Sequence, residues 1–228
     1  MDMKEKLHEI LEQNPFAHLG DVLYTVLYQG IIRMEITADD VLSETALARE
    51  LELSRTPVRN ALMRLQDDGL LLRKGASFCV APLLKDECRA LMETRLAIEG
   101  QAAFLAAVRI IPKQQNDLNE LMKRYAAACC KWETDKIVEY DHAFHQAVVD
   151  ASDNPILADI YRQLSPRILH YRHYMFSRAG KNELEPVLKN SVRLHQSVFN
   201  AIQSGYSDIA QKQLERDVAG MMDVIGGW

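Results

Sequence analysis

Two acidic residues and two histidines occupy positions that helical periodicity turns toward a protein core. Asp141 and His145 lie four residues apart on the apolar stripe of residues 133–152. His195 and Asp217 each interrupt the apolar stripe of a later helical segment. If these helices face one another, two imidazoles and two carboxylates converge, and such a set can ligate a divalent metal ion such as zinc, nickel or manganese.

Polar side chains on other helices indicate an organic acid beside this cluster. Arg95 lies on an apolar stripe with Glu99 one turn later, and a guanidinium can grip a carboxylate through two parallel hydrogen bonds. On another helix, Arg167 and Tyr171 could line the same cavity, although Arg167 could equally face solvent or a second subunit. The alternative is an ordinary core, in which these acids and bases pair with one another and bind no ligand.

A second constellation is the pair of arginines Arg55 and Arg59 at the start of a candidate helix. Ser54 can cap this helix, and a shorter helix capped by Ser43 precedes it after a link of about three or four residues. That spacing is typical of a helix-turn-helix, whose second helix presents its first turn to the DNA major groove. We therefore expect Ser54, Arg55, Thr56 and Arg59 to contact DNA.

A short hairpin completes a winged helix-turn-helix in this interpretation. The sequence predicts a strand over residues 70–73, a turn at Lys74 and Gly75, and a second strand over residues 78–81. The tip of this wing carries Arg73 and Lys74. We expect both side chains to touch the DNA backbone or the minor groove.

Charge is distributed unevenly along the chain. The formal net charge of −5 by itself argues against a nucleic-acid partner. Residues 54–74, however, hold five basic side chains against two acidic ones, so positive charge is concentrated on the expected DNA-facing side. So few phosphate contacts imply weak binding by one copy, and a homodimer on a palindromic operator compensates for that weakness.

The length of the chain indicates two domains after a short extension. Its 228 residues, 48% of them hydrophobic, can bury one sizeable core and a smaller one. We assign residues 1–20 to an N-terminal extension, 21–83 to the winged helix-turn-helix, and 84–228 to an all-helical bundle. From Lys85 onward only helical periodicities occur, so the expected fold is mainly α.

Composition argues against a membrane-spanning or disulfide-stabilised protein. No apolar run approaches the ~20 residues that cross a bilayer, and the acidic start is no signal peptide, so we expect a soluble, cytoplasmic protein without a membrane partner. The four cysteines, Cys79, Cys88, Cys129 and Cys130, show no CxxC spacing. We expect them to be reduced residues that serve packing.

The run from Ser54 to Leu62, with Leu65, Gly69 and Leu70 behind it, resembles the winged-helix signature of GntR-type bacterial transcription regulators. Two features depart from that signature. Glu52 stands at the turn position that usually holds glycine, so it must accept a left-handed conformation, at a cost on the order of 1 kcal/mol, or reshape the turn. The wing is also shorter than usual, by about one or two residues.

The second domain resembles the FCD ligand-binding domain of the FadR subgroup of these regulators. The resemblance rests on the run from Asp141 to His145, on Asn154-Pro155, and on Leu194-His195 followed by a final helix. It implies that this domain dimerises, binds an effector, and holds a metal through Asp141, His145 and His195. The fourth family ligand is a histidine, which here is replaced by Asp217.

Asp217 can still ligate a metal, but its negative charge favours a harder cation or weakens direct binding of an anionic effector. Arg95 and Glu99 match an Arg-x-x-x-Glu pair often seen on the first FCD helix, where the arginine contacts the effector. The alternative for this pair is an internal salt bridge.

We therefore expect a homodimeric transcription regulator that binds a double-stranded DNA operator. The resemblance favours a repressor whose operator affinity is changed by a small carboxylate effector, held through the metal in the helical domain. The alternative is a metal-responsive regulator, in which the ion itself is the signal and Arg95 is structural.

The competing class is an enzyme, because a metal held by two histidines and two aspartates could activate water. The sequence shows no obvious general base beside these residues, and a winged helix would have no purpose in such an enzyme. We therefore expect no catalytic activity.

Overall fold

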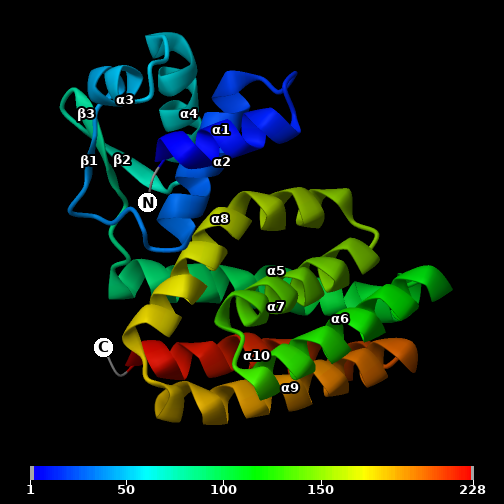
Figure 1. The fold of residues 1–228 in the computed structure, drawn as a ribbon. Coiled ribbons are helices and arrows are strands. Elements are labelled where there is room, and N and C mark those ends of the chain that lie inside the picture. The colour runs from blue at the N-terminus through cyan, green and yellow to red at the C-terminus, as the bar shows by residue number, and fades with distance from the viewer. Residues whose placement is uncertain (1–2, 227–228) are drawn as a thin grey trace. The chain divides into compact units, whose positions relative to one another are not determined.

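The computed structural model describes residues 3–226, with side chains as far as Met221. The chain divides between Pro82 and Leu83 into two compact units, each with its own buried core (Figure 1). Helices dominate both units, and the described strands form one three-stranded sheet in the first. This confirms the expected mainly α fold. None of the described helices is long and apolar enough to cross a membrane.

The first unit is a winged helix-turn-helix preceded by one additional helix. Its elements are α1 (Met3–Gln13), α2 (Leu19–Ile32), β1 (Val41–Leu42), α3 (Glu44–Glu50), α4 (Arg55–Asp67), β2 (Leu71–Lys74) and β3 (Ser77–Val80). Helices α2 and α4 pack on each other through apolar residues at helical spacing, including Leu23, Leu27, Leu62 and Leu65, none of which is exposed. This packing holds α4 in place as the second helix of the motif.

The wing is a tight hairpin. Strand β3 pairs antiparallel with both β1 and β2, and Lys74 pairs with Ser77, so Gly75 and Ala76 alone form the turn. Gly75 has a φ of 63°, which such two-residue turns require and glycine adopts at little cost. The bounds predicted for the two strands, 70–73 and 78–81, were therefore each wrong by one residue. Lys74 belongs to β2 and not to the turn.

The turn between α3 and α4 differs from the sequence expectation at one cap. The Ser43 side chain accepts a hydrogen bond of 3.5 Å from the backbone N–H of Ala46, as an N-cap of α3 should. Ser54 occupies the N-cap of α4 in an extended conformation, but its side chain makes no capping hydrogen bond. Glu52 has a φ of 55°, so this residue accepts the left-handed conformation.

The second unit is a helical bundle. Its described elements are α5 (Lys85–Arg109), α6 (Pro112–Lys131), α7 (Thr134–Ala151), α8 (Pro155–Arg178), α9 (Lys181–Gln203) and α10 (Ser207–Gly226). Pro112 and Pro155 begin their helices at the position where a missing backbone N–H costs least. Helix α10 lies along α5 and α9, and α6 lies along α7 (Figure 1).

Gly100 permits the close approach of α5 and α10. A Cβ atom at this position would lie 2.7 Å from Oε1 of Glu215 on α10, closer than real Cβ contacts allow. The approach brings the inward faces of the two helices together. Both of these faces carry polar residues that were singled out in the sequence.

The left-handed conformation of Glu52 gives a stability prediction. Glycine adopts this conformation without the steric cost that the Cβ atom of alanine incurs. The free energy of unfolding of Glu52→Gly should therefore exceed that of Glu52→Ala by about 1 kcal/mol. Both variants lose the exposed ion pair between Lys4 Nζ and Glu52 Oε1, 2.6 Å apart, so their difference reports the backbone alone. Hydrogen exchange of the α3 and α4 amides measures it. Equal protection in the two variants would contradict the prediction.

Candidate metal centre and nucleic-acid interface

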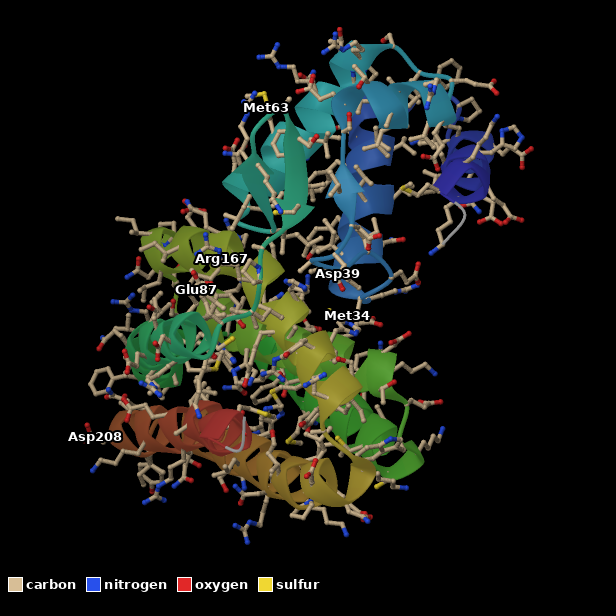
Figure 2. The ribbon with its side chains drawn as sticks, turned by 90° about the vertical axis from the view of Figure 1, so that its left-hand side faces the viewer. Met34, Asp39, Met63, Glu87, Arg167 and Asp208 are labelled. Carbon is tan, nitrogen blue, oxygen red and sulfur yellow. The ribbon has the colours of Figure 1, made fainter. Side chains whose placement is uncertain are left out.

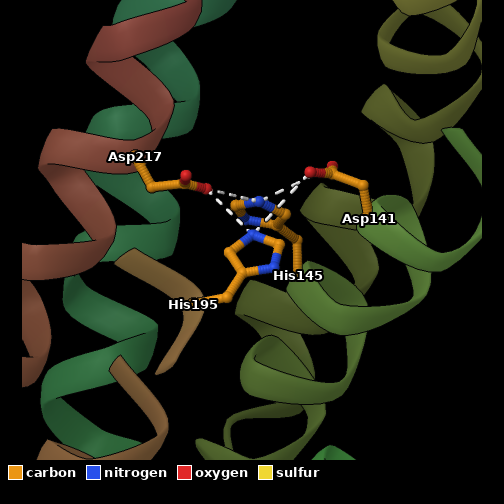
Figure 3. A group of neighbouring side chains, drawn as sticks. All are labelled: Asp141, His145, His195 and Asp217. Atoms are coloured by element: carbon orange, nitrogen blue, oxygen red, sulfur yellow. Dashed lines mark hydrogen bonds and ion pairs between the residues drawn. The ribbon is translucent and has the colours of Figure 1, made fainter. Parts of the chain in front are cut away.

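The four predicted metal ligands come together inside the second unit. Asp141 and His145 project from α7, His195 from α9 and Asp217 from α10, and one ligand atom of each lies within 4.8 Å of the others (Figure 3). Asp217 is 3% exposed and the other three side chains are completely buried. The helical stripes noted in the sequence therefore do face one another, and the four side chains form one cluster.

The imidazoles present the same nitrogen to the carboxylates. Nε2 of His145 and Nε2 of His195 each lie 3.1 Å from Oδ2 of Asp217. The same two nitrogens lie 3.7 Å from the carboxylate oxygens of Asp141, His145 Nε2 from Oδ2 and His195 Nε2 from Oδ1. Two nitrogens and two carboxylates thus surround a common centre, as the ligands of a four-coordinate cation do.

Glu99 fixes the orientation of His145. Its Oε2 atom lies 2.6 Å from Nδ1 of His145, and its two oxygens accept hydrogen bonds of 2.5 and 3.3 Å from Nε and Nη2 of Arg95. Burial alone would raise the pKa of Glu99, but the charges of Arg95 and His145 outweigh burial and lower it to about 2. An ionised Glu99 accepts a hydrogen bond from Nδ1–H of His145, so Nε2 is the nitrogen that faces the cluster.

Arg95 is therefore occupied by an internal salt bridge. Its side chain is 1% exposed and that of Glu99 is completely buried, so the pair lies within the core. The sequence left open whether this arginine contacts an effector or pairs with Glu99. In this structure, its Nε and Nη2 atoms bond to Glu99 and its Nη1 atom to the sulfur of Met92.

The cluster stabilises charged forms of its members. Burial alone would lower the pKa of His145, but the carboxylates of Glu99, Asp141 and Asp217 outweigh it and raise this pKa to about 9. Burial would raise the pKa of Asp217, but His195 and His145 hold it well below its usual range. Asp217 is thus ionised at neutral pH, which is the form that ligates a metal, and a metal at Nε2 of His145 would displace the proton that the raised pKa retains on that imidazole.

Several atoms of the cluster lack a hydrogen-bond partner. These atoms are Oδ1 of Asp141, Oδ1 of Asp217 and Nδ1 of His195. Buried polar atoms nearly always have a partner, so an orphaned set on one cluster indicates a missing one. The donor set of two imidazoles and two carboxylates fits a divalent cation.

Arg172 was missed in the sequence and lies beside the cluster. Its Nη1 atom pairs with Oδ2 of Asp141, and the residue is 5% exposed on α8. The signal was available, because Arg172 lies four residues after the buried Ile168 and three before the buried Met175. The helical repeat alone therefore predicts that Arg172 lies on the buried face of α8.

The other two candidates on α8 lie in different surroundings. Arg167, labelled in Figure 2, is exposed and so does not line a buried site, because its position on the helix faces away from the buried stripe of Ile168. Tyr171 is 1% exposed and belongs to an apolar cluster with residues such as Met92 and Leu188. Neither is among the four clustered ligands.

A cavity reaches the cluster from one side. It has a volume of about 230 Å³ and is lined by residues of α9 and α10, namely Pro186, Val187, Asn190, Ser191, Asp217, Gly220 and Met221. The Tyr125 hydroxyl on α6 donates a 3.1 Å hydrogen bond to Oγ of Ser191. The ring of His195 stacks on Phe144 with centroids 3.9 Å apart and lies 4.6 Å from the ring of Tyr125. The aromatic contacts hold the imidazole in place.

In the first unit, the predicted DNA-contacting residues lie at the surface. Ser54, Arg55, Thr56 and Arg59 are all exposed at the start of α4. Arg55 is partly engaged, because its Nη2 lies 3.4 Å from Oε2 of Glu44 on α3. The exposed first turn of α4 therefore carries two guanidinium groups that could meet a nucleic acid.

The other three basic residues of 54–74 divide into two kinds. Arg73 and Lys74 are exposed on β2 next to the hairpin turn, and Arg73 donates a 3.3 Å hydrogen bond to the carbonyl of Gly75. Arg64 instead pairs with Asp21 on α2 and lies 4.1 Å above the ring of Tyr24. One of the five basic residues counted in the sequence is thus engaged in packing α4 on α2.

Comparisons with known proteins bear on both units. The model of bacterial regulatory proteins of the gntR family matches residues 19–79, and the FCD domain model matches residues 90–220. The HTH-type transcriptional regulator McbR of Escherichia coli (strain K12) is 29% identical over 145 residues, which cover 63% of this chain and 66% of McbR. The HTH-type transcriptional repressor RspR of the same strain is 25% identical over 202 residues, or 88% of this chain and 86% of RspR.

A solved structure of E. coli McbR/YncC has the same fold. It superposes with a TM-score of 0.76 at 22% sequence identity, and the match covers 93% of this chain and 99% of that one.

The histidine next to Tyr171 gives a prediction for the pH dependence of stability. His170 is only 3% exposed, and burial together with the charge of His173 lowers its pKa to about 4. Between the unfolded value of about 6.5 and pH 4, the unfolded state binds the extra proton, so stability is full above 6.5 and falls as the pH falls. His170→Gln should lose less stability across this window, by up to about 3 kcal/mol.

Urea unfolding at several pH values, followed by tryptophan fluorescence, measures this difference. The signal reports the second unit, because both tryptophans of the chain follow Leu83. His8→Gln is the control, since His8 is exposed in the first unit and should leave the profile unchanged. Parallel profiles for wild type and His170→Gln would refute the prediction.

Proposed function

The chain belongs to the gntR family of bacterial regulatory proteins and carries an FCD domain, and we propose that it is a homodimeric repressor which a small carboxylate releases from its operator. Proteins of this family are DNA-binding transcription regulators and not enzymes. The repressor role, the dimer and the effector are the parts of this proposal that go beyond family membership.

The proposed contact with DNA is the first turn of α4. Arg55 and Arg59 are exposed there, and helix-turn-helix proteins place this turn in the major groove. Arg73 and Lys74 on the wing would contact the backbone or the minor groove. Four exposed cations per subunit give few phosphate contacts, so two subunits on a palindrome provide the affinity of a specific regulator.

The proposed sensor is the buried cluster of the second unit. The single observation that carries it is that one ligand atom from each of Asp141, His145, His195 and Asp217 lies within 4.8 Å of the others inside the bundle, where Oδ1 of Asp141 and Oδ1 of Asp217 make no hydrogen bond. Asp141, His145, His195 and Asp217 would hold a divalent cation, which supplies a Lewis-acid contact for a carboxylate. Glu99 holds His145 in the tautomer that this requires.

Helix α5 offers a physical route from this cluster to the first unit. It begins at Lys85, directly after the division of the chain at Leu83, and it carries Glu99, which bonds to His145. A ligand that shifts the packing of α5 would alter the relation between the two winged helices of a dimer. A coupling of about 1–3 kcal/mol is typical of such linkage.

The second candidate is a metal-responsive regulator, and one observation favours it. Arg95, the arginine best placed to grip an effector, is already bonded to Glu99, so an acid would have to displace an internal partner. Operator affinity measured during titration with zinc, with and without a panel of carboxylates, separates the two. A change that needs the acid supports the metabolite sensor, whereas a full change with zinc alone supports the metal sensor.

The cluster predicts metal content directly. Purified wild-type protein should carry close to one equivalent of a divalent metal by elemental analysis, and His195→Ala should lose most of it, because one of the four clustered ligands is removed. His8→Ala, an exposed histidine in the first unit, is the matched control and should keep the metal. Full metal content in His195→Ala would exclude the proposed site.

The first turn of α4 predicts the effect of losing one guanidinium. Arg59→Ala should weaken binding to a duplex selected from a random library by about 1–3 kcal/mol if it contacts a base, or lower the salt slope by about one if it contacts a phosphate. Fluorescence anisotropy at several salt concentrations measures both quantities. Arg124→Ala, an exposed arginine on α6, should change neither. Unchanged affinity in Arg59→Ala would show that α4 does not meet DNA as proposed.

A further inference from the structure

The side of α4 that faces away from its core carries two further side chains beside the arginines. Helical spacing places Asn60 and Met63 opposite the buried stripe of this helix. Both are exposed, and Met63 is 44% exposed although its side chain is large and apolar (Figure 2). This side of α4 therefore presents an amide and a thioether to whatever it contacts. The buried stripe consists of Val58, Ala61, Leu62 and Leu65.

Asn60 and Met63 form a ridge between two open grooves. One groove, of about 760 Å³, lies between α4 and residues 18–21 at the start of α2. The other, of about 530 Å³, is lined by Arg55 and Arg59 among others. Asn60 and Met63 line both grooves. The DNA major groove admits an α-helix, so an exposed ridge on α4 is the part of the helix that can enter deepest.

The part of α4 that suits DNA ends at Met63. From Arg55 to Met63 the helix rises about 12 Å, at 1.5 Å per residue, and this is about the width of the major groove. Further along the helix, Arg64 is paired with Asp21. The exposed carboxylate of Asp67, one turn after Met63, would be repelled by DNA phosphates. Met63 is therefore the last side chain of this face that can reach the bases.

The chemistry of the two side chains matches adenine and thymine. A carboxamide such as that of Asn60 can accept from the N6 amino group of adenine and donate to its N7 atom, and no other base presents this pair of groups in the major groove. An apolar side chain such as Met63 can contact the C5 methyl group of thymine, which cytosine lacks. The two residues lie three apart on the helix, so their side chains are neighbours and can meet neighbouring bases.

We infer that Asn60 and Met63 give this protein a preference for adenine and thymine in each half-site of its operator, beside a guanine that Arg59 contacts. The Asn60 amide bonds to N6 and N7 of the adenine, and the Met63 side chain contacts the thymine methyl group. This inference rests on the proposed function, because it requires the first turns of α4 to lie in the major groove.

The test changes single groups on both partners. A duplex that the full-length protein selects from a random library is remade with 7-deazaadenine, which lacks the N7 acceptor, or with uracil, which lacks the thymine methyl group, at one position at a time. Fluorescence anisotropy should show that wild type loses about fivefold in affinity at one adenine and severalfold at one thymine of each half-site. Asn60→Ala should bind the adenine and 7-deazaadenine duplexes equally, and Met63→Ala should bind the thymine and uracil duplexes equally.

Asn116→Ala is the matched control, since it makes the same substitution at an exposed position of α6. It should keep the full sensitivity of wild type to both replacements. Asn60→Gln retains a carboxamide, which can also bond to adenine, so it should recover part of the sensitivity to 7-deazaadenine. A role of Asn60 in folding alone would not produce this recovery.

A wild-type protein that tolerates 7-deazaadenine at every adenine and uracil at every thymine would overturn the inference. Variants that remain as sensitive as wild type would overturn it too, and sensitivity to one replacement alone would overturn the role of the other side chain. In each case a weaker affinity of Arg59→Ala would leave the proposed contact of α4 with DNA standing. Selection of no duplex by wild type would overturn both.

Discussion

The second unit depends on charges that are buried inside a helical bundle and must satisfy one another there. A buried ion without a counterion costs several kcal/mol, so the helices can close only in an arrangement that pairs each charge. Arg95 meets Glu99, Glu99 meets His145, His145 and His195 meet Asp217, and Arg172 meets Asp141. These contacts join α5, α7, α8, α9 and α10, so the polar network specifies how the helices are arranged as well as the site.

In the first unit, by contrast, two arginines of α4 are exposed to solvent. Arg55 and Arg59 are exposed at the surface of α4, where water solvates their charges. Arg64, only five residues further along the same helix, is tied to Asp21 and lies over Tyr24, so its charge serves packing. The face of the helix on which an arginine lies therefore decides whether its side chain is left exposed or packs against a neighbouring helix.

Periodicity predicted most of the fold and the ligand set, and local geometry accounts for what it could not predict. The stripe of α7 places Asp141 and His145 at a shared centre, and the stripes of α9 and α10 add His195 and Asp217, because the inward direction of a helix follows from its repeat. Whether two such stripes face each other is decided by long-range packing, which sequence alone does not contain. Arg95 bonds to Glu99, and Arg172 pairs with Asp141. Both contacts depend on distances of a few ångströms, which a periodic pattern does not specify. The one-residue error in the wing came from the two-residue turn at Gly75.

Helix α5 is long enough that a small tilt at one point would displace its N-terminal end by a larger distance. Glu99 is held near the cluster by His145, while Lys85 begins the helix beside the division of the chain. At 1.5 Å of rise per residue, the stretch between them spans about 21 Å, so a tilt of about 5° pivoting at Glu99 displaces the start of the helix by about 2 Å. Motion too small to break a hydrogen bond at the pivot is thus magnified at the far end. A tilt of α5 at Glu99 would therefore appear as a larger displacement at Lys85 than at the pivot itself.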